Sequence, residues 1–418
     1  MLKSSAVYFG SSIVNKAIPF LLLPVLTRYL SPAEYGTVAI FQVLLTFLNP
    51  VVDLNISQNI LRKYFHLSRE DLAAYIANIL LVLFGSFTVA TILLAAVVLF
   101  TGNVFGLPAG WITVLPLISL VNMVNKCNLV LLIQERRPLA YGTYEIGSTI
   151  LNVTVSLTLI IAYGMGWEGR ATGILTASVI IGLISLVHMR RRRLLLPSVS
   201  SVSIREILKV SLPLVPHMLG IVVVGFTDRL FIDRMLGKEA VGIYAVGYQF
   251  GMITMLFGDA FMKSWSPWFF RAIKDPLRID RGRIVRYTYG FVAAMIAAAL
   301  AITAASHLAF DIMVDAEFSS GLSVVLWIAL GFAVRGIYQC MLLYLIHEGR
   351  TSFLAINTAV AAVANIGLTY LLISINGAVG AAQASLIAYG IMSIGTWWYA
   401  NRIYSMPWFS PRPALDEG

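Results

Sequence analysis

The feature that most constrains this chain is a succession of apolar stretches, several of which run for about 20 residues without a charge. At about 1.5 Å per residue, a helix of that length crosses a hydrocarbon core about 30 Å thick. Charged residues make up only 12% of the chain, against about 25% in a soluble domain. Because so few charges cannot cover a surface that faces water, we expect an all-α integral membrane protein.

The polar breaks between these stretches predict twelve transmembrane helices. They are expected at residues 6–27, 37–60, 75–100, 111–133, 141–163, 171–189, 210–233, 239–262, 286–307, 321–346, 352–374 and 378–400. The first stretch has full span length and no small-residue cleavage site behind it, so we expect a retained helix and not a signal peptide. The chain then divides into an N-terminal lobe at 1–189, a basic cytoplasmic linker at 190–209, a C-terminal lobe at 210–400 and a tail at 401–418.

The basic residues alternate between the two sides of the predicted membrane. The N-terminus, every second loop and the tail together hold 22 of the 30 Lys and Arg residues. The positive-inside rule therefore places both termini in the cytoplasm. Topology accounts for the net charge of +10, so that charge does not indicate a nucleic-acid partner. Within the linker, residues 204–210 are either an amphipathic helix on the membrane surface or part of a simple tether.

The two halves resemble each other. Residues 127–135 align with residues 340–348 at an offset of 213, and residues 30–36 align with residues 236–242 at an offset of 206. Because each half holds six helices, an even number, the repeats are parallel. We expect two lobes around a central cavity, with the substrate between the repeats near the middle of the bilayer. The alternative is chance similarity between leucine-rich helices.

Charged residues deep in the predicted spans are few, and most of them are cationic. A charge at that depth costs a few kcal/mol and normally faces a cavity or a partner. The candidate substrate-binding residues are Lys16, Asn122, Lys126, Arg335 and Gln339. Cations that face a cavity suit an anionic substrate, and the planar fork of Arg suits phosphate. The alternative is that these cations pair with acids on neighbouring helices, namely Asp53, Asp259 or Glu145.

Two further polar clusters lie near helix ends. The inner mouth of a transport path would be lined by Asp53, Asn59 and Arg62. Near the outer end of the seventh helix, an external gate or a self-paired network would consist of Asp228, Arg229, Asp233 and Arg234. Cys127 and Cys340 lie inside apolar stretches, so we expect buried thiols and neither a disulfide nor a metal site.

Several motifs resemble those of a known family. The run from Phe20 to Gly36 resembles the start of the polysaccharide (Wzx-like) flippases. These belong to the multidrug/oligosaccharidyl-lipid/polysaccharide (MOP) exporter superfamily, which includes the MATE transporters. The segment from Asp233 to Tyr244 is similar to that family's second-half motif, and Glu348-Gly349-Arg350 to its loop after the tenth helix.

The resemblance implies a flippase in the inner membrane of a prokaryote. Its cargo would be a polyprenyl-diphosphate-linked oligosaccharide for a cell-surface polysaccharide such as the O-antigen of lipopolysaccharide, moved to the outer leaflet by alternating access. Membrane lipid and polysaccharide-assembly proteins are the other expected partners. No GxxxxGK[ST] loop occurs, so we expect no ATP hydrolysis. The largest loop is basic and presents no acid pair or His cluster, so we expect no enzymatic activity and no cofactor. H⁺ or Na⁺ is the candidate coupling ion, with His217 and Asp259 as the candidate coupling residues. The alternatives are a multidrug extruder of organic cations from the same superfamily and a membrane polymerase or glycosyltransferase.

Overall fold

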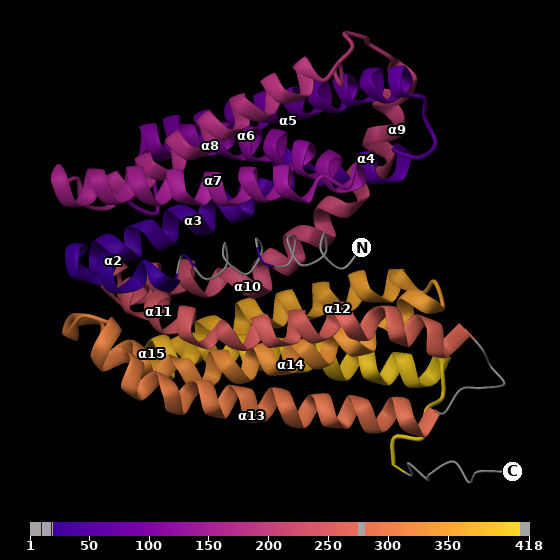
Figure 1. Cartoon of the computed structure of the whole chain (residues 1–418). Coiled ribbons are helices and arrows are strands. Elements are labelled where there is room, and N and C mark those ends of the chain that lie inside the picture. The colour runs from indigo at the N-terminus through magenta and orange to yellow at the C-terminus, as the bar shows by residue number, and fades with distance from the viewer. Residues whose placement is uncertain (1–9, 11–17, 19, 275–280, 410–418) are drawn as a thin grey trace, which may run out of the picture. The chain divides into compact units, whose positions relative to one another are not determined.

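The computed structural model describes the chain except for residues 1–9, 11–17, 19, 275–280 and 410–418. The chain forms two compact units, Met1–Val222 and Val223–Gly418, and each is described by itself. The described residues are almost all helical, because a chain in lipid must satisfy its backbone hydrogen bonds within each segment. Figure 1 shows the helices of each unit running back and forth in antiparallel order.

The first unit is built from long helices joined by short turns. Its elements are α2 (Leu23–Tyr29), α3 (Pro32–Asp53), α4 (Ser57–Lys63), α5 (Arg69–Thr101), the two-residue strands β1 (Asn103–Val104) and β2 (Leu107–Pro108), α6 (Ala109–Gln134), α7 (Pro138–Leu157), the π-helical turn η1 (Thr158–Ala162), α8 (Gly166–Arg191), α9 (Ser201–Ser211) and the 3₁₀ turn η2 (Leu212–Leu214). The next helix, α10 (Val215–Leu236), begins in this unit and ends in the second. The segment from residue 190 to residue 209 thus packs with the first unit.

The second unit continues from α10 with the same architecture. Its further elements are α11 (Lys238–Gly251), α12 (Ile253–Lys274), α13 (Arg281–Met313), the 3₁₀ turn η3 (Ala316–Gly321), α14 (Leu322–His347) and α15 (Thr351–Ile403). The last of these is two helices, because Gly377 adopts a φ of 59° and breaks the helix there.

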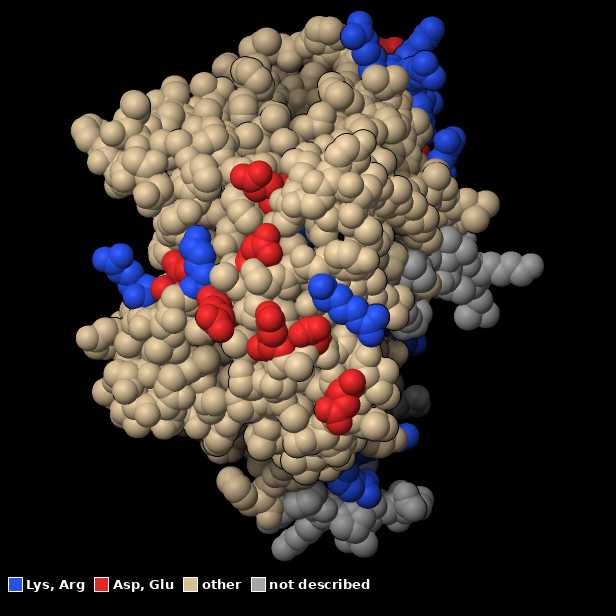
Figure 2. Space-filling view, turned by 90° about the vertical axis from the view of Figure 1, so that its left-hand side faces the viewer, with Lys and Arg blue, Asp and Glu red and all other residues tan. Residues whose placement is uncertain are grey.

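The prediction of an all-helical membrane protein is confirmed. In the described residues, ten helical segments are long and apolar enough to cross a membrane, and the last of them, 353–403, contains the two helices that meet at Gly377. The predicted first span, 6–27, lies mostly outside the described residues. Figure 2 shows the left-hand side of Figure 1, on which scattered acidic side chains and several basic ones are exposed.

The capping signal before the second predicted helix is formed as the sequence indicates. Ser31 caps α3: its hydroxyl accepts a hydrogen bond from the backbone N–H of Glu34 at 3.3 Å. The carboxylate of Glu34 in turn accepts one from the backbone N–H of Ser31 at 3.0 Å. This reciprocal capping box satisfies two backbone donors that the first turn of a helix leaves free.

The internal repeat is visible in the backbone. The helix α6 ends in a turn in which Arg136 has a φ of 56°, and α14 ends in a turn in which Gly349 has a φ of 66°. These positions are 213 residues apart, which is the offset of the sequence repeat. The last hydrogen bonds also correspond, because Arg137 N–H donates to the carbonyl of Leu132 and Arg350 N–H donates to that of Leu345, each at 2.9 Å.

The fourth helix of each half is central to its own unit. In the first unit α6 contacts α3, α4, α5, α7 and α8, and in the second unit α14 contacts α11, α12, α13 and α15. Each helix carries one of the two cysteines. Cys127 and Cys340 are buried free thiols, as the sequence predicts, and each lies in a hydrophobic core of its unit.

Candidate functional site

In the second unit, three of the polar residues singled out from the sequence lie together between α12 and α14. The guanidinium of Arg335 lies 4.0 Å from the carboxylate of Asp259, with 29% and 27% of the two side chains exposed. The amide of Gln339 also donates to that carboxylate, at 3.5 Å. Of the two interpretations that the sequence leaves open for Arg335, the structure shows the pair with Asp259 on a neighbouring helix.

The first unit holds a similar arrangement between α3 and α6. Lys126 is an exposed side chain on α6 and lies within electrostatic range of Asp53, the last residue of α3. The carboxylate of Asp53 also accepts a hydrogen bond from the backbone N–H of Asn55 at 2.9 Å. Asn122, one helical turn before Lys126, is exposed as well. Lys16 lies outside the described residues.

The two arrangements are related by the internal repeat. The offset of 206 carries Asp53 onto Asp259, and the offset of 213 carries Lys126 onto Gln339 and Asn122 onto Arg335. Each unit thus carries an aspartate on its second predicted helix and a cation on its fourth, 4.0 Å apart in the second unit and within electrostatic range in the first. We call these the first-unit pair (Asp53 and Lys126) and the second-unit pair (Asp259 and Arg335).

The energetics of these pairs favour exchange of partners. An ion pair that is partly exposed and has no short contact contributes about 0–1 kcal/mol. A phosphate that accepts charge-assisted, bidentate hydrogen bonds from Arg binds more strongly than such a pair. The aspartates can therefore hold the cations in place without preventing an anion from displacing them.

The residues of the predicted inner mouth differ in exposure. Arg62 is exposed on α4. Asn59 is only 1% exposed, and its amide donates to the hydroxyl of Ser211 at 2.9 Å. Placing Asn59 at a water-filled mouth is therefore a wrong prediction, because this side chain fastens α4 to the end of α9.

The four residues of the predicted external gate fall into two pairs with different surroundings. Asp228 and Arg229 are 1% and 6% exposed, and a carboxylate oxygen of Asp228 lies 3.0 Å from Nη1 of Arg229. The hydroxyl of Tyr244 donates to the other carboxylate oxygen, and the ring of Tyr248 lies 3.9 Å from the guanidinium. The pair is thus a buried self-paired network, which was the alternative to a gate.

The other half of that cluster lies at the end of α10. Arg234 is exposed and Asp233 is half-buried, and Asp233 lies within electrostatic range of Lys238 at the start of α11. These two residues are at a helix end, as the sequence predicts. They lie in the last turn of α10, next to the connection to α11.

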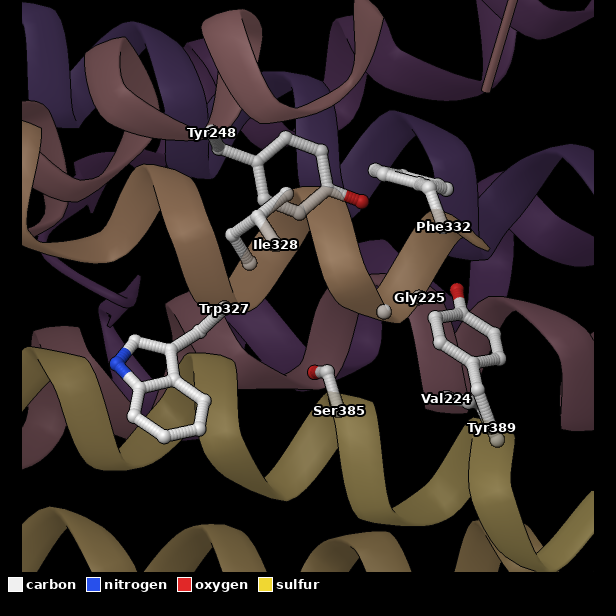
Figure 3. Close-up of a pocket in the computed structure, with 9 residues that line it drawn as sticks. Val224, Gly225, Tyr248, Trp327, Ile328, Phe332, Ser385 and Tyr389 are labelled. Atoms are coloured by element: carbon white, nitrogen blue, oxygen red, sulfur yellow. The ribbon is translucent and has the colours of Figure 1, made fainter. Parts of the chain in front are cut away.

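A narrow cavity lies beside the buried pair in the second unit. It has a volume of about 10 Å³ and is lined mainly by aromatic and aliphatic side chains. Figure 3 shows the rings of Tyr248, Phe332 and Tyr389 around Gly225, with Trp327 and Ser385 along the remaining wall. Ligand pockets usually measure about 300–1,000 Å³, so this cavity is too small for a lipid-linked sugar.

Sequence reasoning missed several buried polar residues. Arg170, which it assigned to a loop, lies inside the first unit and donates to Asn152 and, at 2.8 Å, to Ser156. Asn365, the repeat equivalent of Asn152, is fully buried in the second unit, and neither atom of its amide has a hydrogen-bond partner in the described part of the chain. The shared Asn at the repeat offset was the only signal that could have pointed to these positions.

The remaining candidates concern ion coupling. His217 lies half-buried in α10, and among the residues that the structure describes its Nδ1 has no hydrogen-bond partner. Asp259, the other candidate, belongs to the second-unit pair. No group of three or more His, Cys, Asp or Glu side chains in the described ranges is arranged to hold a metal ion.

Comparisons with known proteins agree with these features. A family model described as polysaccharide biosynthesis protein matches residues 1–273. Among curated proteins, one from the Lsg locus of Haemophilus influenzae is 22% identical over 280 residues, which is 65% of this chain and 67% of that protein. A membrane protein of the same species is 23% identical over 288 residues, 66% of each chain. The chain thus spans about two thirds of the length of these relatives.

Among solved structures, two proteins with a similar fold are described as a flippase and a transporter. The lipid II flippase MurJ in an inward closed conformation matches with a TM-score of 0.71 and 14% identity, over 96% of this chain and 88% of that one. An inward-facing multidrug resistance MATE family transporter of the MOP superfamily matches with a TM-score of 0.68 and 14% identity, over 93% and 94%. At this identity the likeness establishes the fold.

Proposed function

Because the chain belongs to the polysaccharide biosynthesis protein family, we propose that it is a flippase for a polyprenyl-diphosphate-linked oligosaccharide. It would carry this lipid from the cytoplasmic to the outer leaflet of a prokaryotic inner membrane, by alternating access, with both termini in the cytoplasm. The observation that carries the proposal is the repeated pair of aspartate and cation, one in each unit. A diphosphate can replace the aspartates because each pair is partly exposed and weak.

The chemistry of the pairs favours an anionic cargo over an organic cation. Lys126 carries three N–H donors in the first-unit pair, and Arg335 carries five in the second-unit pair. Phosphate oxygens accept such bonds well. An organic cation would meet only Asp53 and Asp259, and each of these is already beside a cation. A multidrug extruder is therefore the second choice.

The same pairs suggest how an ion gradient could drive transport. A proton that binds Asp259 would neutralise its carboxylate and free Arg335 for the diphosphate. His217 is a second candidate, because its ring nitrogen has no hydrogen-bond partner among the described residues. The proposal then predicts that a pH gradient accelerates transport by the wild type and has little effect on an Asp259→Asn variant.

The direct test is a vesicle assay with purified protein and a lipid-linked oligosaccharide. Transport is measured as the appearance of the sugar on the opposite leaflet, detected by a membrane-impermeant lectin. Each of Lys126→Gln and Arg335→Gln should slow transport about 10- to 100-fold, since a hydrogen bond to a charged group contributes about 1.5–3 kcal/mol. Arg191→Gln, which removes an exposed charge at the end of α8, is the matched control and should transport normally.

Three results would contradict the proposal. Equal rates for the two variants and the control would remove the pairs from the transport path. Export of a cationic dye by the wild type, unaffected by both variants, would favour the multidrug extruder. Formation of a longer glycan by the purified chain alone would favour a polymerase or glycosyltransferase.

A further inference from the structure

The first unit contains an apolar groove at the end of α3. The groove has a volume of about 490 Å³, and its walls are the last turn of α3, the segment 81–89 of α5, the stripe Ile204, Leu208 and Leu212, and the start of α10. Ser86 is the one polar side chain of this lining, and its hydroxyl donates to the backbone carbonyl of Val52. The surface that the groove offers to a ligand is therefore almost entirely hydrocarbon.

The groove exists because α3 stops while its neighbour continues. Leu54 and Asn55 have φ values of 48° and 50°, so the chain leaves the helix there and starts α4 at Ser57. The helix α5 runs on for 33 residues and leaves a space beside the end of α3. At Gly85 of α5, nothing lies within 4 Å of the position that a Cβ atom would occupy, which shows that this part of the wall is open.

The third wall, α9, contacts the rest of the first unit through a buried side chain, an ion pair and a hydrogen bond. Ile207 is buried in a hydrophobic core of the first unit. Glu206 forms an ion pair of 2.8 Å with Lys63 of α4, and Ser211 accepts the hydrogen bond from Asn59. The stripe Ile204, Leu208 and Leu212 has a spacing of four, so it follows one face of the helical segment along the groove.

Two cations lie beside this stripe. Arg205 and Lys209 are exposed and line a shallow depression together with Ile204, Leu208 and Leu212. Neither has an ion-pair partner among the described residues, whereas the acid between them, Glu206, is paired with Lys63. The depression that shares this stripe with the groove therefore carries two positive charges.

We propose that this groove binds one acidic membrane phospholipid, with an acyl chain between α5 and α9 and the phosphate between Arg205 and Lys209. The segment 81–89 rises about 12 Å along α5, close to the depth of one leaflet, about half of 30 Å. Acidic lipids of the cytoplasmic leaflet attract basic residues near the surface. Such a lipid would hold α9, the segment that leads into α10, against the first unit.

Native mass spectrometry of the whole chain tests the proposal, with phosphatidylglycerol and phosphatidylcholine as the probes. The wild type should retain phosphatidylglycerol more tightly than phosphatidylcholine. A double variant, Arg205→Gln with Lys209→Gln, should weaken phosphatidylglycerol binding about 30-fold and abolish the preference. The double variant Arg190→Gln with Arg191→Gln removes the same charge from the end of α8 and should behave like the wild type.

Filling the groove provides the second arm. Gly85→Leu should fold normally because the site is open, and it should reduce the binding of both lipids while leaving the thermal midpoint unchanged. Equal retention of the two lipids by the wild type would overturn the proposal, as would equal behaviour of the two double variants. Displacement of phosphatidylglycerol by a lower concentration of polyprenyl phosphate would show that the groove belongs to the carrier lipid, and a dimer that dissociates in Gly85→Leu would assign it to a second copy.

Discussion

The buried pair Asp228 and Arg229 allows a direct test of whether these residues stabilise the second unit or act as a gate. Removing one partner leaves the other charge without its counter-ion in a site that is almost free of solvent. Such a change usually costs about 3–5 kcal/mol, whereas replacing both charges by apolar residues of similar volume is often neutral. We therefore expect Arg229→Met and Asp228→Leu to be strongly destabilising, and the double variant to recover most of the loss.

The structure sets the size of the expected effect. The two side chains are 1% and 6% exposed, and their charged atoms are 3.0 Å apart, so solvent can replace little of the lost interaction. For a unit of about 200 residues, 1 kcal/mol corresponds to about 2–4 °C in the midpoint of thermal unfolding. Each single variant should therefore lower this midpoint by about 6–20 °C.

Thermal unfolding in detergent, followed by intrinsic tryptophan fluorescence, measures this midpoint. The exposed Arg234 supplies the control, because Arg234→Gln should change the midpoint by no more than about 2 °C. Transport is then measured well below the midpoint of each variant. A midpoint of Arg229→Met within 2 °C of the wild type, together with abolished transport, would refute the structural role and restore the gate.

Three further predictions concern helix caps and backbone positions. Each is tested by measuring the midpoint of thermal unfolding of the variant and the wild type in the same detergent. Ser31→Ala removes the α3 cap and should cost about 1 kcal/mol; an unchanged midpoint would show that the capping box is not formed. Arg136→Gly should stabilise the protein and Gly349→Ala should destabilise it, each by about 1 kcal/mol, because both positions have a positive φ, which favours glycine. If both substitutions shifted the midpoint in the same direction, the two turns would not be equivalent. Gly247→Ala drives a Cβ atom into the backbone oxygen of Gly321 and should cost about 1–3 kcal/mol, whereas Gly85→Ala, in open space, should cost nothing.

Much of the fold could be predicted because a bilayer imposes a simple rule on sequence. Span length, helical structure and the position of turns follow from hydropathy and from capping residues such as Ser31. The backbone also repeats where the sequence repeats, as the turns at Arg136 and Gly349 show. These features depend on residues close together in the chain, which is the range over which sequence patterns are informative.

The site was harder to predict because it depends on contacts between helices. Spacing shows that Asn122 and Lys126 share a face, but it does not show which helix that face meets. Asn59 was assigned to a wet mouth because it lies near a helix end, and it is buried because α9 returns to cover it. Arg170 was placed in a loop for the same reason, although α8 begins before it, at Gly166.

A comparison of the two repeats shows that the position of the aspartate is the same in both units and that the position of the cation differs. The aspartate is kept at one aligned position, as Asp53 and Asp259, whereas the cation moves by one helical turn, from Lys126 in α6 to Arg335 in α14, which aligns with Asn122. That shift is about 6 Å along the helix, and the guanidinium of Arg335 still lies 4.0 Å from its aspartate. The repeat therefore keeps the position of the carboxylate, and changes both the position and the type of the cation. A search for identical residues at the repeat offset would miss both pairs, whereas a search for any cation on this face of the fourth helix, with an aspartate on the second, would find them.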